Sequence, residues 1–239
     1  MGRTAGIILI GNELLSGKVA DANAVYLCRE LRALGVDVRR IVVIPDEVER
    51  IAAEVIEFSR GFDVVFTSGG VGPTHDDVNI EGVARAFGVP VVRDPGMVAA
   101  LEGFLGGHLN PARLRMAEIP EGAHPMTADG LVFPAVVMKN VYVLPGLPAE
   151  MEAMFEIVER ELPAERPIGS WRGKYRTTES QIVSVLRDAG ERHPEVRVGS
   201  YPSFGPSGSE VEVVLKSNDP AALAAATAWI EQALADAIG

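Results

Sequence analysis

The sequence is poor in the residues and segments that mark exported or membrane-bound proteins. Its 239 residues include a single cysteine, Cys28, so no internal disulfide can form, which suits a reducing compartment. No apolar run approaches the ~18 residues that span a bilayer, and the first residues lack the regions of a signal peptide. We therefore expect a cytoplasmic protein without a membrane-bound segment.

Clusters of lysine and arginine are also missing. The formal net charge is −11, and residues 1–165 hold 14 basic and 24 acidic side chains, whereas residues 166–239 hold 8 and 9. A surface this negative repels the backbone of a nucleic acid, and no basic patch is present to release its counterions. The four histidines are scattered, without the spacing of zinc ligands. We expect neither a nucleic-acid partner nor a zinc site.

The sequence does contain alternating apolar strands and amphipathic helices. Residues 5–10 form a continuous apolar run, which is typical of a strand buried on both faces of a parallel sheet. Further strands are expected at 36–44, 63–67, 131–138 and 140–144, helices at 21–34, 48–59, 78–87 and 148–162, and two short helices between 95 and 117. This alternation predicts an α/β fold with a doubly wound, mostly parallel sheet over residues 1–165.

A second pattern follows a segment rich in proline, glycine and charge at residues 163–173, which we interpret as a linker. Beyond it, strands are expected at 174–177, 196–201 and 210–217, and helices at 179–189 and 220–238. Residues 203–209 are rich in turn-forming types and favour a flexible hairpin loop. This order predicts a smaller α+β domain with a βαββα plan at residues 172–239.

A glycine-rich loop, Ser-Gly-Gly-Val-Gly-Pro-Thr-His-Asp-Asp, stands at residues 68–77 between an expected strand and an expected helix. In open α/β sheets ligands bind beyond the carboxyl ends of the strands, where glycines let backbone N–H groups approach an anion. We therefore expect this loop to bind phosphate. The dinucleotide fingerprint would need a glycine at His75, and residues 11–19 miss the P-loop in spacing and final residue, so standard NAD and ATP motifs are absent.

The two adjacent acids of this loop, Asp76 and Asp77, allow two interpretations. In one, the loop is only a turn: Thr74 caps the helix and the carboxylates complement its dipole. In the other, the carboxylates would repel a bound phosphate unless a divalent cation lay between them, so both become ligands of a Mg²⁺- or Mn²⁺-like ion. His75 is then either a proton shuttle beside them or an exposed turn residue.

Five short segments, taken together and in order, are more specific than any one of them. They lie at residues 11–17, 21–24, 69–77, 119–123 and 144–148. Over residues 5–160 they resemble the competence/damage-inducible protein A (CinA-like) family. The resemblance implies the molybdopterin-binding fold shared with MoaB- and MogA-like proteins, an acidic pair at Asp77 and Glu81, and a homo-oligomer.

The resemblance also implies a chemistry, because members of this family cleave the pyrophosphate bond of nucleotides such as ADP-ribose and a related domain of eukaryotic FAD synthase hydrolyses FAD. We expect hydrolysis of such a diphosphate to release AMP, with Mg²⁺, Mn²⁺ or Co²⁺ at Asp76 and Asp77 and with Glu81 as a third catalytic acid. Arg113 and Arg115 are interpreted as surface residues. The expected substrate-binding residues are Gly11, Glu13, Asn23, Ser68, Gly69, Gly70, Gly72, Pro73, Thr74, Pro145 and Gly146.

Two other functions stay open. The same loop could hold a pterin phosphate in a molybdopterin-binding or nucleotidyl-transfer protein, or it could be a structural relic in a non-catalytic module. Asn12, where many members have threonine, and residues 132–137, which replace a glycine-rich segment, bring the chain closer to the FAD-synthase-associated branch. Nothing matches the amidohydrolase domain of longer members, so we expect no deamidase activity.

Overall fold

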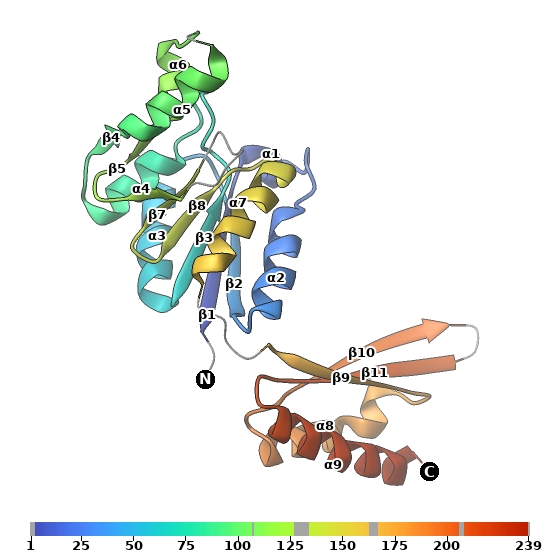
Figure 1. Cartoon of the computed structure of the whole chain (residues 1–239). Coiled ribbons are helices and arrows are strands. Elements are labelled where there is room, and N and C mark those ends of the chain that lie inside the picture. Colours follow the sequence, from blue (N-terminus) through green and yellow to red (C-terminus); the bar gives the residue numbers. More distant parts are fainter. Residues whose placement is uncertain (1–2, 107, 127–133, 163–166, 206–207, 239) are drawn as a thin grey trace. The chain divides into compact units, whose positions relative to one another are not determined.

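The structure, a computed structural model, describes residues 3–106, 108–126, 134–162, 167–205 and 208–238. The chain divides near residue 165 into two compact units, which we describe separately (Figure 1). Among the described residues, no helix is both long and apolar enough to span a bilayer.

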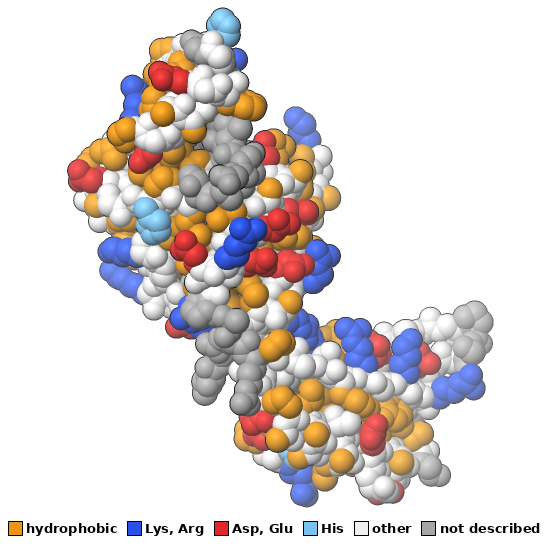
Figure 2. Space-filling view, viewed as in Figure 1, with side chains coloured by type: hydrophobic (Ala, Val, Ile, Leu, Met, Phe, Trp, Pro, Cys, Tyr) orange, Lys and Arg blue, Asp and Glu red, His pale blue; other side chains and the backbone are white. Residues whose placement is uncertain are grey.

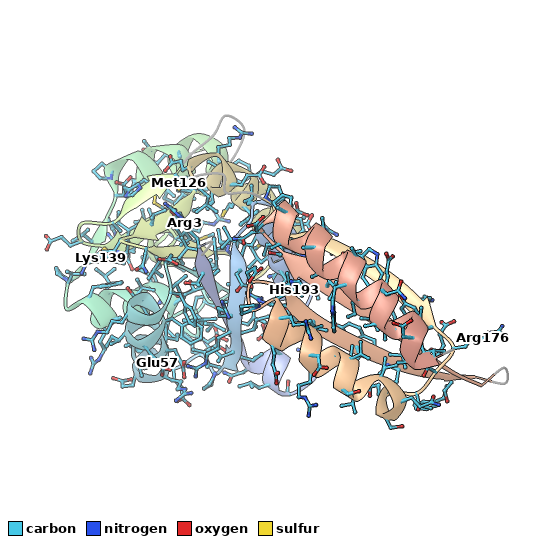
Figure 3. The ribbon with its side chains drawn as sticks, turned by 90° about the horizontal axis from the view of Figure 1, so that it is seen from below. Arg3, Glu57, Met126, Lys139, Arg176 and His193 are labelled. Atoms are coloured by element: carbon cyan, nitrogen blue, oxygen red, sulfur yellow. The ribbon has the colours of Figure 1, made fainter. Side chains whose placement is uncertain are left out.

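The first unit is built on a sheet with the strand order β2-β1-β3-β8-β7-β6 over its described residues. The strands are β1 (Thr4–Ile10), β2 (Asp37–Ile44), β3 (Val64–Ser68), β6 (His124–Met126), β7 (Ala135–Met138) and β8 (Val141–Leu144). The pairs β1–β2, β1–β3 and β3–β8 are parallel, whereas β7 and β6 are added antiparallel. Lys139, with a φ of 55°, makes the turn from β7 to β8 (Figure 3). The predicted mostly parallel α/β fold is confirmed; residues 131–133 of one expected strand lie outside the described residues, and β6 was not predicted.

Helices cover both faces of this sheet (Figure 1). They are α2 (Asn23–Ala33), α3 (Val48–Gly61), α4 (Asn79–Phe87) and α7 (Pro148–Glu161). On one face Phe58 of α3 shares a buried core with Val65 of β3. On the other, the ring of Phe155 in α7 lies 5.8 Å from that of Phe66 in β3 and 5.9 Å from that of Tyr26 in α2. Adjacent strand residues point to opposite faces, so burial of both explains the continuous apolar runs.

Between α4 and β6 the chain makes an excursion of two short helices and two short strands, drawn in green in Figure 1. It consists of β4 (Val91–Arg93), α5 (Pro95–Leu105), α6 (Pro111–Arg115) and β5 (Glu118–Pro120), with β4 antiparallel to β5. The two predicted helices are confirmed. Asp94 and Asn110 cap them by accepting from the N–H groups of Met97 and Arg113. The strand pair and the four-residue helix α1 (Asn12–Leu15) are too short to give a sequence pattern and were not predicted.

The second unit has the predicted βαββα order. Its elements are β9 (Gly169–Tyr175), α8 (Glu179–Arg192), β10 (Arg197–Gly205), β11 (Gly208–Ser217) and α9 (Pro220–Ile238). The antiparallel sheet has the order β10-β11-β9, and its apolar face shares a buried core with Ile182 of α8 and Ile230 of α9. His193, at the end of α8, faces Trp229 of α9 with ring centres 6.2 Å apart (Figure 3).

Two predictions for this unit were wrong. The linker was expected to extend to Gly173, but β9 begins at Gly169. The strand was missed because only Trp171 and Tyr175 of its alternating residues pack on the core, while Gly169 and Gly173 at the other two positions of that face hide the period. The hairpin loop expected at 203–209 is largely strand: Ser203 pairs with Glu210 and Gly205 with Gly208. Turn-forming residues there sit in an exposed antiparallel ladder, which needs no apolar side chains.

Candidate functional site

The glycine loop leaves the carboxyl end of β3 and crosses the end of β1. Gly69 has a φ of 105°, and a Cβ atom added there would lie 2.1 Å from the carbonyl oxygen of Ile10, so only glycine fits. Gly70, with a φ of 63°, accepts a hydrogen bond from the N–H of Asn79 at the start of α4. Among the described residues, the amides of Gly70, Val71 and Gly72 donate to no protein acceptor. Three consecutive free N–H groups at the switch from strand to helix are the kind of donors that can bind an anion.

Buried asparagines hold this loop in place. The Asn23 amide, which is 7% exposed, donates to Ser68 Oγ at 2.9 Å and to the Gly146 carbonyl at 2.8 Å, and the Ser68 hydroxyl donates to the Pro145 carbonyl. Four predicted binding residues, from the end of β3, the segment after β8 and the start of α2, therefore meet in one hydrogen-bonded cluster. Because these four residues bond mainly to one another, their observed role is to fix the glycine loop at residues 68–77, which we call the cradle.

Asn79 is a second such residue, which the sequence analysis missed. Its fully buried amide donates to Thr67 Oγ1 at 3.0 Å and to the Gly69 carbonyl at 2.8 Å. The sequence feature that could have identified Asn79 was its place as a polar residue between Val78 and Ile80 at the start of an apolar helix. Within the described residues, the Oδ1 atoms of Asn23 and Asn79 are buried without a partner.

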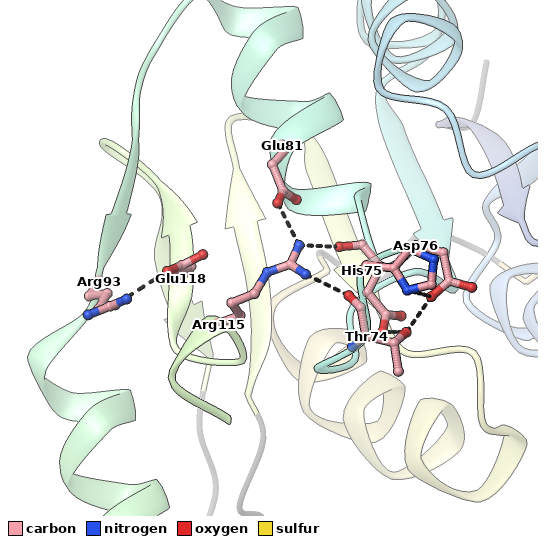
Figure 4. Close-up of polar contacts among 8 residues, drawn as sticks. Thr74, His75, Asp76, Glu81, Arg93, Arg115 and Glu118 are labelled. Atoms are coloured by element: carbon pink, nitrogen blue, oxygen red, sulfur yellow. Dashed lines mark hydrogen bonds and ion pairs between the residues drawn. The ribbon is translucent and has the colours of Figure 1, made fainter. Parts of the chain in front are cut away.

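The acidic end of the loop folds back onto Thr74. The Asp77 carboxylate accepts from the Thr74 N–H at 2.7 Å and from its hydroxyl, and the Asp76 carboxylate accepts from the same hydroxyl (Figure 4). This hydrogen bond holds the pKa of Asp76 below its ordinary value. The alternative in which the loop is only a turn with Thr74 as the helix cap is not supported, because α4 begins at Asn79 and no side chain caps it. His75 is an exposed turn residue, 3.8 Å from Asp76.

Arg115, interpreted from the sequence as a surface residue, clamps this loop instead. Its guanidinium donates to the carbonyls of Thr74 at 2.6 Å and Asp77 at 3.0 Å, and to the Glu81 carboxylate at 2.8 Å (Figure 4). The surface interpretation was wrong because all three partners are at least 34 residues away in the sequence, a distance over which no local pattern carries information. Glu81, expected to be a catalytic acid, is the ion-pair partner of this arginine.

A further group of acids lies on the neighbouring strand ends. The Glu13 carboxylate lies over Gly11, where an added Cβ would be 2.3 Å from Oε1. Asp46, not singled out from the sequence, accepts from the N–H of Asn12 at 2.8 Å. Burial raises the pKa of Asp46 despite that hydrogen bond, and the charges of Glu13 and Asp76 raise it further. Among the described residues, no three histidine, cysteine or acidic side chains are arranged to hold a metal ion by themselves.

A pocket of about 200 Å³ opens beside the loop. Its lining residues are Val71, Gly72, Asp77, Ile80, Met97, Arg115, Met116, Glu118, Pro134, Val136, Val143, Pro145, Leu147, Glu150 and Met154. A smaller hollow next to it adds Gly70 and Glu81. Five predicted site residues, Gly70, Gly72, Asp77, Glu81 and Pro145, line these spaces, whereas Gly11, Glu13, Pro73, Thr74 and Asp76 do not.

The surroundings of the site are acidic. Figure 2 shows Asp and Glu side chains gathered over α2 and α7, where Glu30, Glu152, Glu156 and Glu159 surround Tyr26. After burial, which is the larger effect, these charges raise the pKa of Tyr26. The negative charge of the first unit would therefore repel an anionic ligand, so binding of such a ligand would depend on groups at the loop that offset this repulsion.

Known proteins resemble both units. Residues 6–164 match the family described as a probable molybdopterin-binding domain, and residues 174–238 match the FAD synthase middle domain. A protein of Archaeoglobus fulgidus is 38% identical over 200 residues, which cover 83% of this chain and 86% of that protein. A probable FAD synthase of Caenorhabditis briggsae is 31% identical over 229 residues; the match covers 84% of this chain but only 44% of that protein.

The solved structure of the protein CinA of Thermoplasma acidophilum, described as of unknown function, has a TM-score of 0.62 and 34% identity to this chain. The match covers 66% of this chain and 98% of that one. The family match alone extends over more than half of the sequence, and it contains the glycine loop and both asparagine clusters. The chain therefore belongs to the family of probable molybdopterin-binding domains and is a CinA-like member of it.

Proposed function

We propose that the first unit is a metal-dependent nucleotide pyrophosphatase that cleaves a diphosphate such as FAD or ADP-ribose and releases AMP. The observation that carries this proposal is the row of free amides at Gly70, Val71 and Gly72 beside the carboxylate of Asp77. The amides suit the oxygens of a phosphate, and the carboxylate suits a cation bound to the same phosphate. The similarity of the second unit to the FAD synthase middle domain supports a nucleotide rather than an unrelated anion.

The carboxylates fit a divalent ion of the magnesium type. Such ions are commonly held by one or two protein carboxylates together with substrate phosphates, so the lack of a three-ligand group among the described residues is compatible with binding. Asp77, which lines the pocket, and Asp76, which is exposed, would be the two ligands. When bound, Mg²⁺, Mn²⁺ or Co²⁺ would neutralise the diphosphate and lower the pKa of a bound water.

The residues of the chain then have separate roles. The free amides of the loop hold the phosphate and stabilise the charge that develops on its oxygens during attack by water. Arg115 keeps the carbonyls of Thr74 and Asp77 fixed, and Glu81 keeps Arg115 in place. We therefore assign Glu81 to positioning, although the sequence alone suggested catalysis. The proposal also includes a homo-oligomeric state, which rests on the family resemblance.

The second candidate is pterin binding or nucleotidyl transfer, which the description of the family favours. The same amides would hold the pterin phosphate. The two candidates differ in their products, because a transferase gives a transferred nucleotide without net hydrolysis, whereas a pyrophosphatase gives free AMP.

The test is to incubate the purified protein with FAD and with ADP-ribose, each with Mg²⁺, Mn²⁺ or Co²⁺, and to measure AMP by chromatography. Asp77→Asn should lower the rate by ~100-fold or more, because it removes a charged ligand with little change in shape. Asp188→Asn is the matched control, since the half-exposed Asp188 lies on α8 in the other unit. If the folded wild type releases no AMP with any of the metals, the proposal fails and pterin binding becomes the leading candidate.

A further inference from the structure

Strand β2 is the last strand on one side of the sheet of the first unit, and in the part of the chain that the structure describes nothing pairs with its outer side (Figure 1). The Ile44 carbonyl accepts from the N–H of Gly11, so the backbone groups of Ile44 point into the sheet. Because these groups alternate in direction along a strand, those of Ile41 and Val43 point outward. Such an edge is a template for pairing with another chain.

The side chains along this edge are apolar and uncovered. Ile41 is 44% exposed and Val43 is 41% exposed, whereas Ile7, the partner of Ile41 on β1, is fully buried. Ile7 in turn pairs with Phe66, whose ring contacts Phe155 of α7. Paired residues point to the same face of a sheet, so Ile41 and Val43 lie on the face that α2 and α7 cover. The helical cover therefore ends before it reaches β2.

The exposed stretch of β2 has a defined centre. The register on β1 shifts between Val38 and Arg40, so Arg39 is left over as a β-bulge. At the other end Pro45 stops the strand. A bulge and a proline both block edge pairing, and here they lie three residues before and three residues after Val42. Between them the strand is regular and has no proline, glycine or acidic side chain.

We infer that β2 pairs with β2 of a second copy of this chain, antiparallel about a two-fold axis at Val42. In this register the outward backbone groups of Ile41 lie opposite those of Val43 in the other copy, and each such pair exchanges both N–H···O bonds. The side chains of Ile41 and Val43 from the two copies then contact one another on the α2 face. The sheet continues through the dimer, and the exposed apolar edge is covered.

The charges at the two ends of the strand support a second copy as the partner. The beginning of the stretch is basic, with Arg39 and Arg40, and its end is acidic, because Asp46 and Glu47 follow Pro45. Antiparallel self-pairing brings the basic end of each copy to the acidic end of the other, which is electrostatically complementary. A strand that pairs with itself across a two-fold axis uses both free edges, so the contact closes as a dimer. The inference supplies an interface for the homo-oligomer proposed above.

The first experiment measures the mass of the full chain by light scattering or sedimentation as a function of protein concentration. The wild type should reach the mass of a dimer, about 51 kDa for two chains of 25.5 kDa. Ile41→Lys should raise the dimer dissociation constant by about tenfold or more, because it places a charge in the apolar contact. Val92→Lys, on β4, is the matched control: Val92 is a strand residue that is 36% exposed and lies away from this edge, so this variant should dimerise like the wild type.

The second experiment tests the register by disulfide formation. Cys28→Ser first removes the single native cysteine, and Val42→Cys is then added. The two Val42 positions form a non-hydrogen-bonded pair with Cα atoms about 4.5 Å apart, within the range of a disulfide, so oxidation should give a covalent dimer. Val43→Cys in the same background is the control. It faces Ile41 of the other copy, and the two cysteines lie on a diagonal of about 7–8 Å, too far apart for a disulfide.

Every outcome bears on the inference. A wild type that stays monomeric up to about 100 µM, or an Ile41→Lys variant that dimerises like the wild type, would overturn it. A dimer in which Val42→Cys does not cross-link, or in which Val43→Cys cross-links equally well, would show that another surface or register is used. If circular dichroism shows that Ile41→Lys does not fold, the cysteine pair decides alone. None of these measurements depends on AMP release, so the inference and the proposed activity can fail separately.

Discussion

Replacing Arg115 by methionine tests whether the clamp on the glycine loop matters for activity. The change keeps an apolar stem but removes hydrogen bonds to the Thr74 and Asp77 carbonyls and to the Glu81 carboxylate. Hydrogen bonds to charged groups each contribute about 1.5–3 kcal/mol when water is excluded. Here the side chains of Arg115 and Glu81 are 28% and 33% exposed, so water replaces part of the loss. We expect the free energy of unfolding of the first unit to fall by about 1–3 kcal/mol in total.

The effect on activity should be larger than the effect on stability. Released carbonyls let the Asp77 loop move, and a displacement of about 1 Å in a reacting group can cost ~100-fold in rate. We expect kcat/KM for metal-dependent AMP release to fall by about 30–100-fold. The kcat/KM of Arg115→Lys should lie between those of the wild type and of Arg115→Met, because a single ammonium cannot reach the three acceptors with the geometry of a guanidinium.

The control is Arg113→Met, two residues earlier on the same helix, where the guanidinium donates to the His108 carbonyl and, within the described part of the chain, to no other acceptor. Unfolding should be followed by calorimetry or far-UV circular dichroism, because both tryptophans, Trp171 and Trp229, lie in the second unit and their fluorescence does not report on the first. If Arg115→Met retains wild-type kcat/KM, or if both methionine variants lose activity equally, the clamp has no specific role.

Three further changes test the construction of the site. Gly69→Ala should abolish AMP release and lower the melting temperature, because the new Cβ would meet the Ile10 carbonyl; wild-type melting and rate would contradict this. Asn79→Ala should destabilise the first unit by about 2 kcal/mol, measured by calorimetry, since it leaves Thr67 and the Gly69 carbonyl without their buried donor. Burial raises the pKa of Asp46 in the folded protein above the ordinary aspartate value of 3.8. As pH rises, Asp46 therefore loses its proton in the unfolded chain before it does so in the folded one. The free energy of unfolding of the wild type should decline as pH rises from 3.8 through the raised pKa. Asp46→Asn should therefore be more stable than wild type at pH 7 and no more stable below that range; an equal difference at all pH values would exclude titration of Asp46 as the cause.

Local sequence patterns predicted most elements of the fold. Continuous apolar runs such as residues 5–10 predicted buried parallel strands, because both faces of the sheet are covered and every side chain of β1 beyond Thr4 is buried. The helix at Pro220–Ile238 was predicted to the residue. The failures lie where tertiary structure replaces a pattern: β9 has only two aromatic residues facing its core, and β4 and β5 have three residues each.

The site was predictable in its position but not in its connections. Glycines at a strand end identify the cradle, because the positive φ of Gly69 and Gly70 excludes most other residues. Nothing in the order of residues shows that Arg115 reaches Glu81 or that Asn23 reaches Gly146, since these contacts depend on how elements distant in the sequence pack together. The sequence therefore indicated which residues are chemically capable, whereas the structure separates those that hold the loop from those that face the pocket.

That separation also indicates how an acidic unit would accept the anionic substrate proposed above. Residues 1–165 carry a net charge of −10, yet exposed charges more than ~8 Å apart are largely screened at physiological ionic strength, so the groups bonded to the loop dominate. Among these, the charge of Glu81 is offset by Arg115, and the asparagines that fix the cradle are neutral. Asp76 and Asp77 remain as uncompensated charges beside the free amides. A diphosphate adds further negative charge at that point, so its binding should require a divalent cation, and the dependence on metal should persist at salt concentrations that screen the rest of the surface.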